Sequence, residues 1–99
     1  MDNTVLSIGD VVIDFSAYTV TKSGQQLDFT TKEIEILKFF AENTGKVLSR
    51  QQILDAVWGL DAVSSDRTID THIKNIRKKL DVECIITVKN VGYKFEVSV

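Results

Sequence analysis

The sequence has 99 residues, of which 43% are hydrophobic and 26% are charged, and its formal net charge at pH 7 is −2. This length suits one domain with a single modest core, and the fractions are ordinary for a globular protein. No apolar run approaches the length of a membrane span, so we expect no membrane partner.

Short β-rich runs separated by turn residues occupy the first third of the chain. Apolar and polar residues alternate within the runs, and Gly9-Asp10 and Ser23-Gly24 fall between them. The close spacing permits hairpins and leaves no room for helical crossovers. We therefore expect a four-stranded antiparallel sheet, with strands at 6–8, 11–15, 17–21 and 26–29.

The period of the apolar residues changes at residue 30. Thr30 and Glu33 have the spacing of a capping box, in which each side chain bonds the other residue's backbone N–H at a helix start. Apolar residues follow at helical spacing, and Asn43-Thr44-Gly45 is typical of a helix end. A first helix is predicted between these two signals.

A second capping box, formed by Ser49 and Gln52, predicts another helix start. Apolar residues at positions 53, 54, 57 and 58 give this helix its buried face, and Gly59 ends it. We assign Trp58 to the core rather than to a platform for a ligand. A loop then leads to the third helix.

The third helix, from about residue 67 to residue 80, has the clearest amphipathic pattern in the chain. At about 100° per residue, four apolar side chains fall within an arc of roughly 60° and predict the face that enters the core. These residues are Ile69, Ile73, Ile76 and Leu80. The opposite face and its borders carry polar side chains, namely Arg67, Thr68, Thr71, Lys74, Asn75 and Lys78.

The flanks of this helix leave two alternatives open. Asp70 and Arg77 share one flank, two turns apart, where they either contact a partner or pair with each other. His72 lies near the apolar edge on the other flank. Its ring is either satisfied locally or free to contact a phosphate.

Charge is distributed unevenly along the chain. Residues 1–66 hold five Lys or Arg and ten Asp or Glu, whereas residues 67–99 hold seven and four. The two parts therefore carry net charges of −5 and +3. Because exposed charges are screened beyond about 8–10 Å, a locally basic surface can attract phosphate even on an acidic body.

The chain closes with a second β-rich segment. Residues 85–88 and 93–97 flank a turn in which Asn90 and Gly92 both tolerate positive φ, which predicts a hairpin. Lys89 lies at its tip, where a cation can enter or brace a minor groove.

A sheet, three helices and a hairpin in this order are typical of a winged helix, a variant of the helix-turn-helix. We therefore predict an α+β fold in which residues 1–99 form one winged helix-turn-helix domain. It has an N-terminal four-stranded antiparallel sheet, three helices and a C-terminal β-hairpin wing.

The polar face of the third helix suits the major groove, which is about 12 Å wide and admits a helix. Asn75 is the best candidate for a base contact, because an amide can bond N6 and N7 of adenine, and Thr71 can touch a thymine methyl. Lys74 and Lys78 are flexible point charges that suit phosphates. Arg67 can reach a phosphate or a guanine.

Two alternatives to DNA binding differ in the support that the sequence gives them. One is a protein-interaction winged helix that binds no DNA, which the acidic first part of the chain allows. The other is an enzyme, for which the sequence offers no support. It has one His and one Cys without metal-ligand spacing and no Gly-rich phosphate loop, so we predict no catalytic site, metal, cofactor or small-molecule substrate. Cys84 is expected to be a small core or edge residue rather than a reactive thiol.

Four segments, at 29–37, 48–59, 66–80 and 87–95, together resemble the OmpR/PhoB-type output domains of bacterial response regulators. The resemblance implies regulation of transcription by binding double-stranded promoter DNA, often as tandem pairs on direct repeats. It implies that the following positions lie on or beside the DNA: Arg67, Thr68, Asp70, His72, Lys74, Asn75 and Arg77, with Thr87 and Lys89 in the wing. It also implies a loop that can contact RNA polymerase, formed by Leu60, Asp61, Ala62, Val63 and Ser64.

The sequence departs from the family pattern at a few of these positions. Asn75 stands where many relatives carry Arg, and Lys74 and Lys89 stand where Arg is frequent. Attraction by point charges is therefore expected to outweigh bidentate recognition. The family's receiver domain is absent, so we expect this chain to be the output half of a longer regulator. Because the N-terminus shows no signal peptide, we expect a cytoplasmic protein.

Overall fold

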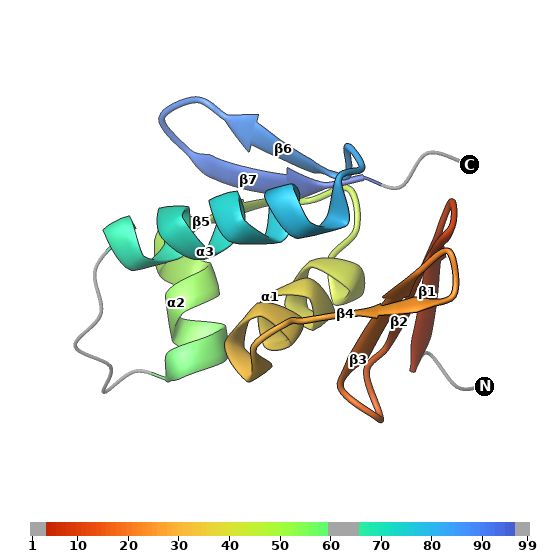
Figure 1. Cartoon of the computed structure of the whole chain (residues 1–99). Coiled ribbons are helices and arrows are strands. Elements are labelled where there is room, and N and C mark those ends of the chain that lie inside the picture. The colour runs from red at the N-terminus through yellow and green to blue at the C-terminus, as the bar shows by residue number, and fades with distance from the viewer. Residues whose placement is uncertain (1–3, 60–65, 97–99) are drawn as a thin grey trace.

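The structure, a computed structural model, describes residues 4–59 and 66–96, and it describes residues 66 and 67 by their backbone alone. Three helices and two antiparallel sheets form the domain, which confirms the predicted α+β fold. Figure 1 shows the N-terminal sheet at one end of the molecule and the C-terminal hairpin lying along the third helix.

The N-terminal sheet has four strands in chain order, each antiparallel to the next, as predicted. The third strand begins two residues later than predicted. The reason is the carboxylate of Asp14, which accepts hydrogen bonds from the backbone N–H and the hydroxyl of Ser16 and from the N–H of Ala17, and so extends the turn. The strands are β1 (Val5–Ile8), β2 (Val11–Asp14), β3 (Thr19–Lys22) and β4 (Gln25–Leu27).

Both predicted capping boxes are present. Helix α1 (Thr31–Glu42) has Thr30 as its N-cap, and helix α2 (Arg50–Trp58) has Ser49. Each cap exchanges hydrogen bonds with the side chain and backbone of the residue three positions later. Gly59 is the C-cap of α2 with a φ of 90°, a conformation that glycine adopts without steric cost.

Helix α3 (Asp66–Leu80) packs on the other two helices. Its four predicted core residues, Ile69, Ile73, Ile76 and Leu80, are all 0% exposed. They belong to one hydrophobic core that also includes side chains from the N-terminal sheet, α1, α2 and the C-terminal strands. Cys84 is buried in this core and Trp58 is partly buried against it, so both predictions are confirmed.

The C-terminal hairpin belongs to a three-stranded sheet, which the sequence did not predict. Its strands are β6 (Ile85–Val88) and β7 (Gly92–Phe95), and a third strand, β5 (Val47–Ser49), pairs with β7 on the other side. We call β6, β7 and the turn between them the wing. In this turn Asn90 has the expected positive φ of 66°.

Gly92 does not use its tolerance of positive φ, because its φ is not positive. A glycine is needed there for space instead. A Cβ at this position would lie 2.0 Å from the carbonyl oxygen of Leu48 on β5, so only glycine allows the two strands to approach this closely.

Two lysines tie helix ends to neighbouring elements. Lys22 on β3 donates to the carbonyl of Leu80, the last residue of α3, at 3.0 Å. Lys32 on α1 donates to the carbonyl of Val57 near the end of α2 at 3.1 Å. Cations at these positions satisfy carbonyls that lack helical partners. No helix within the described residues is long and apolar enough to cross a membrane.

Candidate nucleic-acid interface

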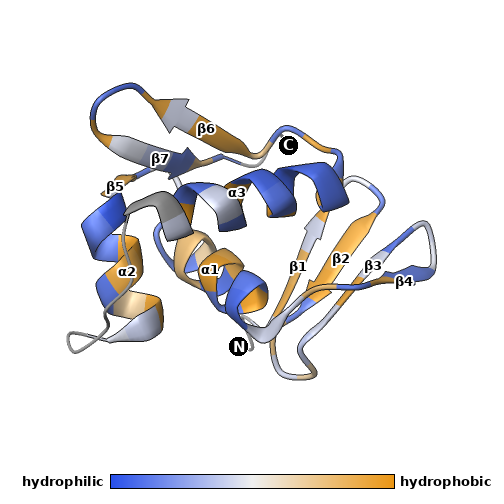
Figure 2. Cartoon of the chain, turned by 60° about the vertical axis from the view of Figure 1, so that its left-hand side comes forward, coloured by the Kyte–Doolittle hydropathy of each residue, from blue (hydrophilic) through white to orange (hydrophobic). Residues whose placement is uncertain are grey.

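The face of α3 opposite the buried isoleucines is exposed. Lys74, Asn75 and Lys78 all lie on it with exposed side chains, and Thr71 is exposed one turn earlier. Figure 2 shows hydrophilic residues along this helix. The orientation predicted from the apolar period is therefore confirmed, with two lysines and an amide directed outward.

The wing adds a second group of exposed residues. Lys89, Asn90 and Val91 form its turn, and Thr87 is exposed on β6. In both Figure 1 and Figure 2 the hairpin runs alongside α3, with its turn toward the N-terminal end of that helix. The polar face of α3 and the tip of the wing can therefore contact one extended partner together.

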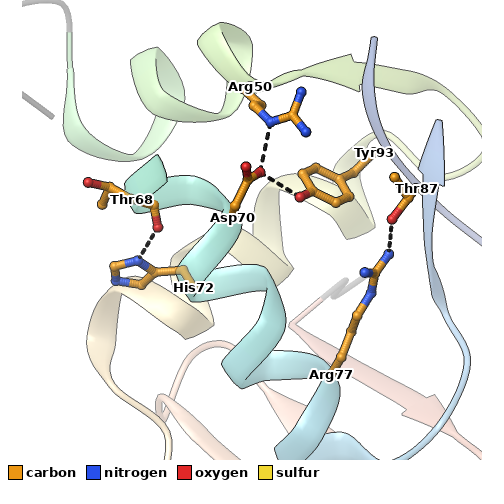
Figure 3. Close-up of polar contacts among 7 residues, drawn as sticks. All are labelled: Arg50, Thr68, Asp70, His72, Arg77, Thr87 and Tyr93. Atoms are coloured by element: carbon orange, nitrogen blue, oxygen red, sulfur yellow. Dashed lines mark hydrogen bonds and ion pairs between the residues drawn. The ribbon is translucent and has the colours of Figure 1, made fainter. Parts of the chain in front are cut away.

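Asp70 lies between three elements rather than on the open face. Its Oδ1 atom accepts hydrogen bonds from Nε of Arg50 on α2, at 2.7 Å, and from the hydroxyl of Tyr93 on β7, at 2.6 Å (Figure 3). The hydrogen bond from Tyr93, together with the adjacent Arg50 guanidinium, lowers the pKa of Asp70. The carboxylate therefore stays charged and is neutralised within the domain.

Arg77 contacts the wing rather than Asp70, a pairing that the sequence had left open as one of two alternatives. Its Nε and Nη2 atoms donate to the carbonyl of Ile85, at 3.2 and 2.9 Å, and Nη2 also donates to the hydroxyl of Thr87 at 2.8 Å. The guanidinium carbons of Arg77 and Arg50 each lie 5.4 Å from the ring centroid of Tyr93. Cations at this distance are attracted by an aromatic ring.

His72 has the local arrangement that the sequence left open. Its Nδ1 atom lies 2.8 Å from the carbonyl oxygen of Thr68, one turn earlier on α3. The ring meets Trp58 edge to face, with centroids 5.2 Å apart. The contact of His72 with Trp58 thus helps to hold the first half of α3 on α2.

Lys79 on α3 turns toward the body of the domain. Its Nζ atom bonds Oε1 of Glu33 at 2.7 Å and lies 5.2 Å from the ring centroid of Phe29. Sequence reasoning missed this pair and also missed the contribution of Arg50 and Tyr93. Glu33 was recognised only as a capping residue, and no local pattern signals its second partner, 46 positions away.

The outward-facing charges are therefore fewer than the sequence of α3 suggests. Lys74, Lys78 and Lys89 are exposed, whereas Arg77 and Lys79 have internal partners. This arrangement offers point charges to an anionic backbone, with the amide of Asn75 between them as both donor and acceptor. The side chain of Arg67 and the predicted polymerase loop, residues 60–64, lie outside the described residues.

Metal binding finds no support in the part of the chain that the structure describes, where no group of three His, Cys, Asp or Glu side chains could hold an ion. Among the same residues, every buried side-chain nitrogen or oxygen has a hydrogen-bond partner. In this part of the chain, no buried side-chain polar atom is therefore left without a partner.

Comparison with known proteins agrees with this geometry. Residues 24–95 match the family model described as "Transcriptional regulatory protein, C terminal". Sensory transduction protein RegX3 of Mycolicibacterium smegmatis is 35% identical over 100 residues, which cover 96% of this chain and 44% of RegX3. The chain thus spans less than half the length of this relative.

Two solved structures show the same fold. Response regulator DrrB of Thermotoga maritima, an OmpR/PhoB homologue, has a TM-score of 0.82 at 38% identity, covering 94% of this chain and 44% of DrrB. The DNA-binding domain of Klebsiella pneumoniae RstA, in complex with the RstA box, has a TM-score of 0.79 at 28% identity, covering 95% of this chain and 98% of that domain.

Proposed function

This chain belongs to the OmpR/PhoB-type family of transcriptional regulatory C-terminal domains, and from this premise we propose that it binds double-stranded promoter DNA to regulate transcription. One observation carries the proposal. The same helix buries four apolar residues completely and exposes Lys74, Asn75 and Lys78 on its other side, beside a wing that ends in Lys89. The complex of RstA with its DNA box supports the assignment.

In this proposal α3 enters the major groove and the wing lies against the adjacent minor groove. Lys74 and Lys78 bind phosphates, Asn75 reads a base edge, and Lys89 braces the minor-groove side. The proposed contact set also retains Arg67, Thr68 and Thr71 on α3 and Thr87 on the wing.

The wider biological setting is also a proposal. We place the chain as the output half of a cytoplasmic two-component response regulator, since it spans only 44% of RegX3. A second copy bound in tandem and RNA polymerase, contacted through residues 60–64, are the partners proposed besides DNA. DNA occupancy beside a promoter would then recruit or block polymerase.

Selection of bound sequences from a random duplex pool, followed by a salt titration on a selected duplex, tests the proposal. The logarithm of the binding constant should fall linearly with the logarithm of salt concentration, by about 0.9 per phosphate neutralised. Three exposed lysines therefore predict a slope of about −3 or steeper. Absence of binding at low salt, or binding that salt does not affect, would favour the alternative of a winged helix that binds a protein.

A further inference from the structure

We infer that Asp70 and Tyr93 are positioning residues, which fix the wing on α3 and thereby place Lys89 for DNA, an inference that rests on the proposed function. Oδ1 of Asp70 accepts a hydrogen bond from the Tyr93 hydroxyl at 2.6 Å and another from Nε of Arg50 at 2.7 Å (Figure 3). A single carboxylate oxygen thus joins α2, α3 and β7.

A second connection holds the other strand of the wing. Arg77 lies seven residues after Asp70, about two helical turns along the same flank of α3, and its guanidinium donates to the carbonyl of Ile85 and the hydroxyl of Thr87 on β6. Both strands of the wing are therefore bound to one flank of α3, each by its own side chain. These hydrogen bonds add to the packing of Tyr93 and Phe95 in the core, which also holds the wing.

The ring of Tyr93 strengthens the same junction. Arg50 and Arg77 each place a guanidinium carbon 5.4 Å from its centroid. The hydrogen bond from the Tyr93 hydroxyl to Asp70 fixes the orientation of the ring. The ring, in this orientation, makes cation–π contacts with both arginines. Loss of the hydroxyl therefore removes a directional bond while it leaves the apolar ring in place.

This junction affects DNA binding because the contacts of the wing and of α3 are made together. A wing held at a fixed angle presents Lys89 without having to be ordered on binding, so less conformational entropy is lost. If the junction is loosened, the Lys89 contact contributes less. The contacts of α3 itself should change little, because four buried side chains hold that helix independently.

A double-mutant cycle tests this inference, with a labelled duplex recovered by selection as the probe. Tyr93→Phe removes only the hydroxyl, and Lys89→Ala removes the proposed contact of the wing. The fold-loss caused by Lys89→Ala should be smaller in the Tyr93→Phe protein than in the wild type, by about threefold or more. Lys78→Ala should cause the same fold-loss in both backgrounds. Tyr18→Phe, in the turn between β2 and β3, is the matched control and should leave the Lys89→Ala loss unchanged.

Amide hydrogen exchange of the free protein provides a second measurement that needs no DNA. Exchange in β6 and β7 should accelerate in the Tyr93→Phe protein, while exchange in the N-terminal sheet stays at the wild-type rate. Unchanged exchange in the wing, or fully additive effects of Tyr93→Phe and Lys89→Ala, would overturn the positioning role while leaving DNA binding intact. Failure of the wild type to bind any selected duplex would instead overturn the proposed function and this inference with it.

Discussion

The Nζ atom of Lys79 lies 2.7 Å from Oε1 of Glu33, whose side chain is only 3% exposed. The same oxygen accepts the backbone N–H of Thr30 at 2.8 Å. One buried carboxylate thus caps the start of α1 and anchors the last turn of α3. Lys79, one of the cations of α3, is therefore used to hold the helix on the body.

Replacement of Glu33 by alanine should lower the free energy of unfolding by about 2–4 kcal/mol. The change removes a capping partner and leaves Lys79 without its counter-charge in a partly buried site. Glu33→Gln should cost less, because glutamine completes a capping box, as Gln52 does at α2. Urea unfolding measures both variants. Glu42→Ala, at the exposed end of α1, is the control, and an equal loss there would contradict the assignment.

Asp70→Asn should change the pH dependence of stability. The hydrogen bond from Tyr93 and the neighbouring Arg50 lower the pKa of Asp70 below its ordinary value of 3.8. The unfolded chain therefore takes up this proton more readily than the folded chain, so the carboxylate stabilises the fold above pH 3.8. That contribution is lost as the pH falls through the lower pKa of the folded state.

Urea unfolding of the wild type and Asp70→Asn between pH 7 and acid measures this effect. The variant should be the less stable protein at neutral pH, and the difference should narrow below pH 3.8. A difference that stays constant over the whole range would show that the charge of Asp70 does not contribute.

The thiol of Cys84 should be inert in the folded protein. Its side chain is 1% exposed, and burial raises its pKa from 9.0 to about 11. At pH 8 the thiolate fraction is then lower than in the unfolded chain by about 100-fold, and access is restricted as well. The rate of reaction with iodoacetamide, with and without urea, checks this. Comparable rates in the two conditions would contradict the burial.

Gly92→Ala should separate β5 from the wing. The added Cβ would lie 2.0 Å from the carbonyl oxygen of Leu48, and backbone must move to make room for it. We expect a loss of about 1–3 kcal/mol or more in the free energy of unfolding, as for other overpacked sites. Val91→Ala, at the exposed neighbouring position, should change stability by less than about 0.5 kcal/mol. Similar values for the two variants would exclude a steric cause.

The features that the sequence predicted are those that depend on neighbours along the chain. A helix with Ile69 and Ile73 on one face must place Lys74 and Lys78 on the other, so burial and exposure follow from the helical period alone. The capping boxes are local in the same way, because both partners lie within four residues. These local rules correctly predicted the helices, most of the core and the outward face of α3.

The features that were missed depend on segments brought together only by the fold. Val47–Ser49 is too short to show strand alternation, and it becomes a strand because β7 lies beside it. The sequence left a pairing of Asp70 with Arg77 open because both share a flank of α3. Asp70 bonds Arg50 and Arg77 bonds the wing instead, because the fold places these groups better for a hydrogen bond.

The proposed roles of Asn75 in base contact and of Lys78 in phosphate contact can be tested with one pair of variants. Asn75→Ala should cost about 1–3 kcal/mol on the selected duplex and relax the preference at one base position, because an amide bonds a base edge bidentately. Lys78→Ala should weaken binding to all sequences alike and flatten the salt slope by about one unit, because a lysine neutralises a phosphate whatever the base.

Both outcomes are read from a repeated selection and a salt titration with each variant. Lys38→Ala, an exposed lysine on α1, is the matched control for the loss of a charge and should leave the preference and the salt slope near wild type. Asn75 and Lys78 differ in chemistry but lie side by side on one exposed face. A difference between their effects on base preference and on the salt slope is therefore expected to come from their chemistry. Equal losses for Asn75→Ala and Lys78→Ala on every duplex, with no change in preference, would mean that Asn75 reads no base and that specificity arises from DNA shape or from the wing.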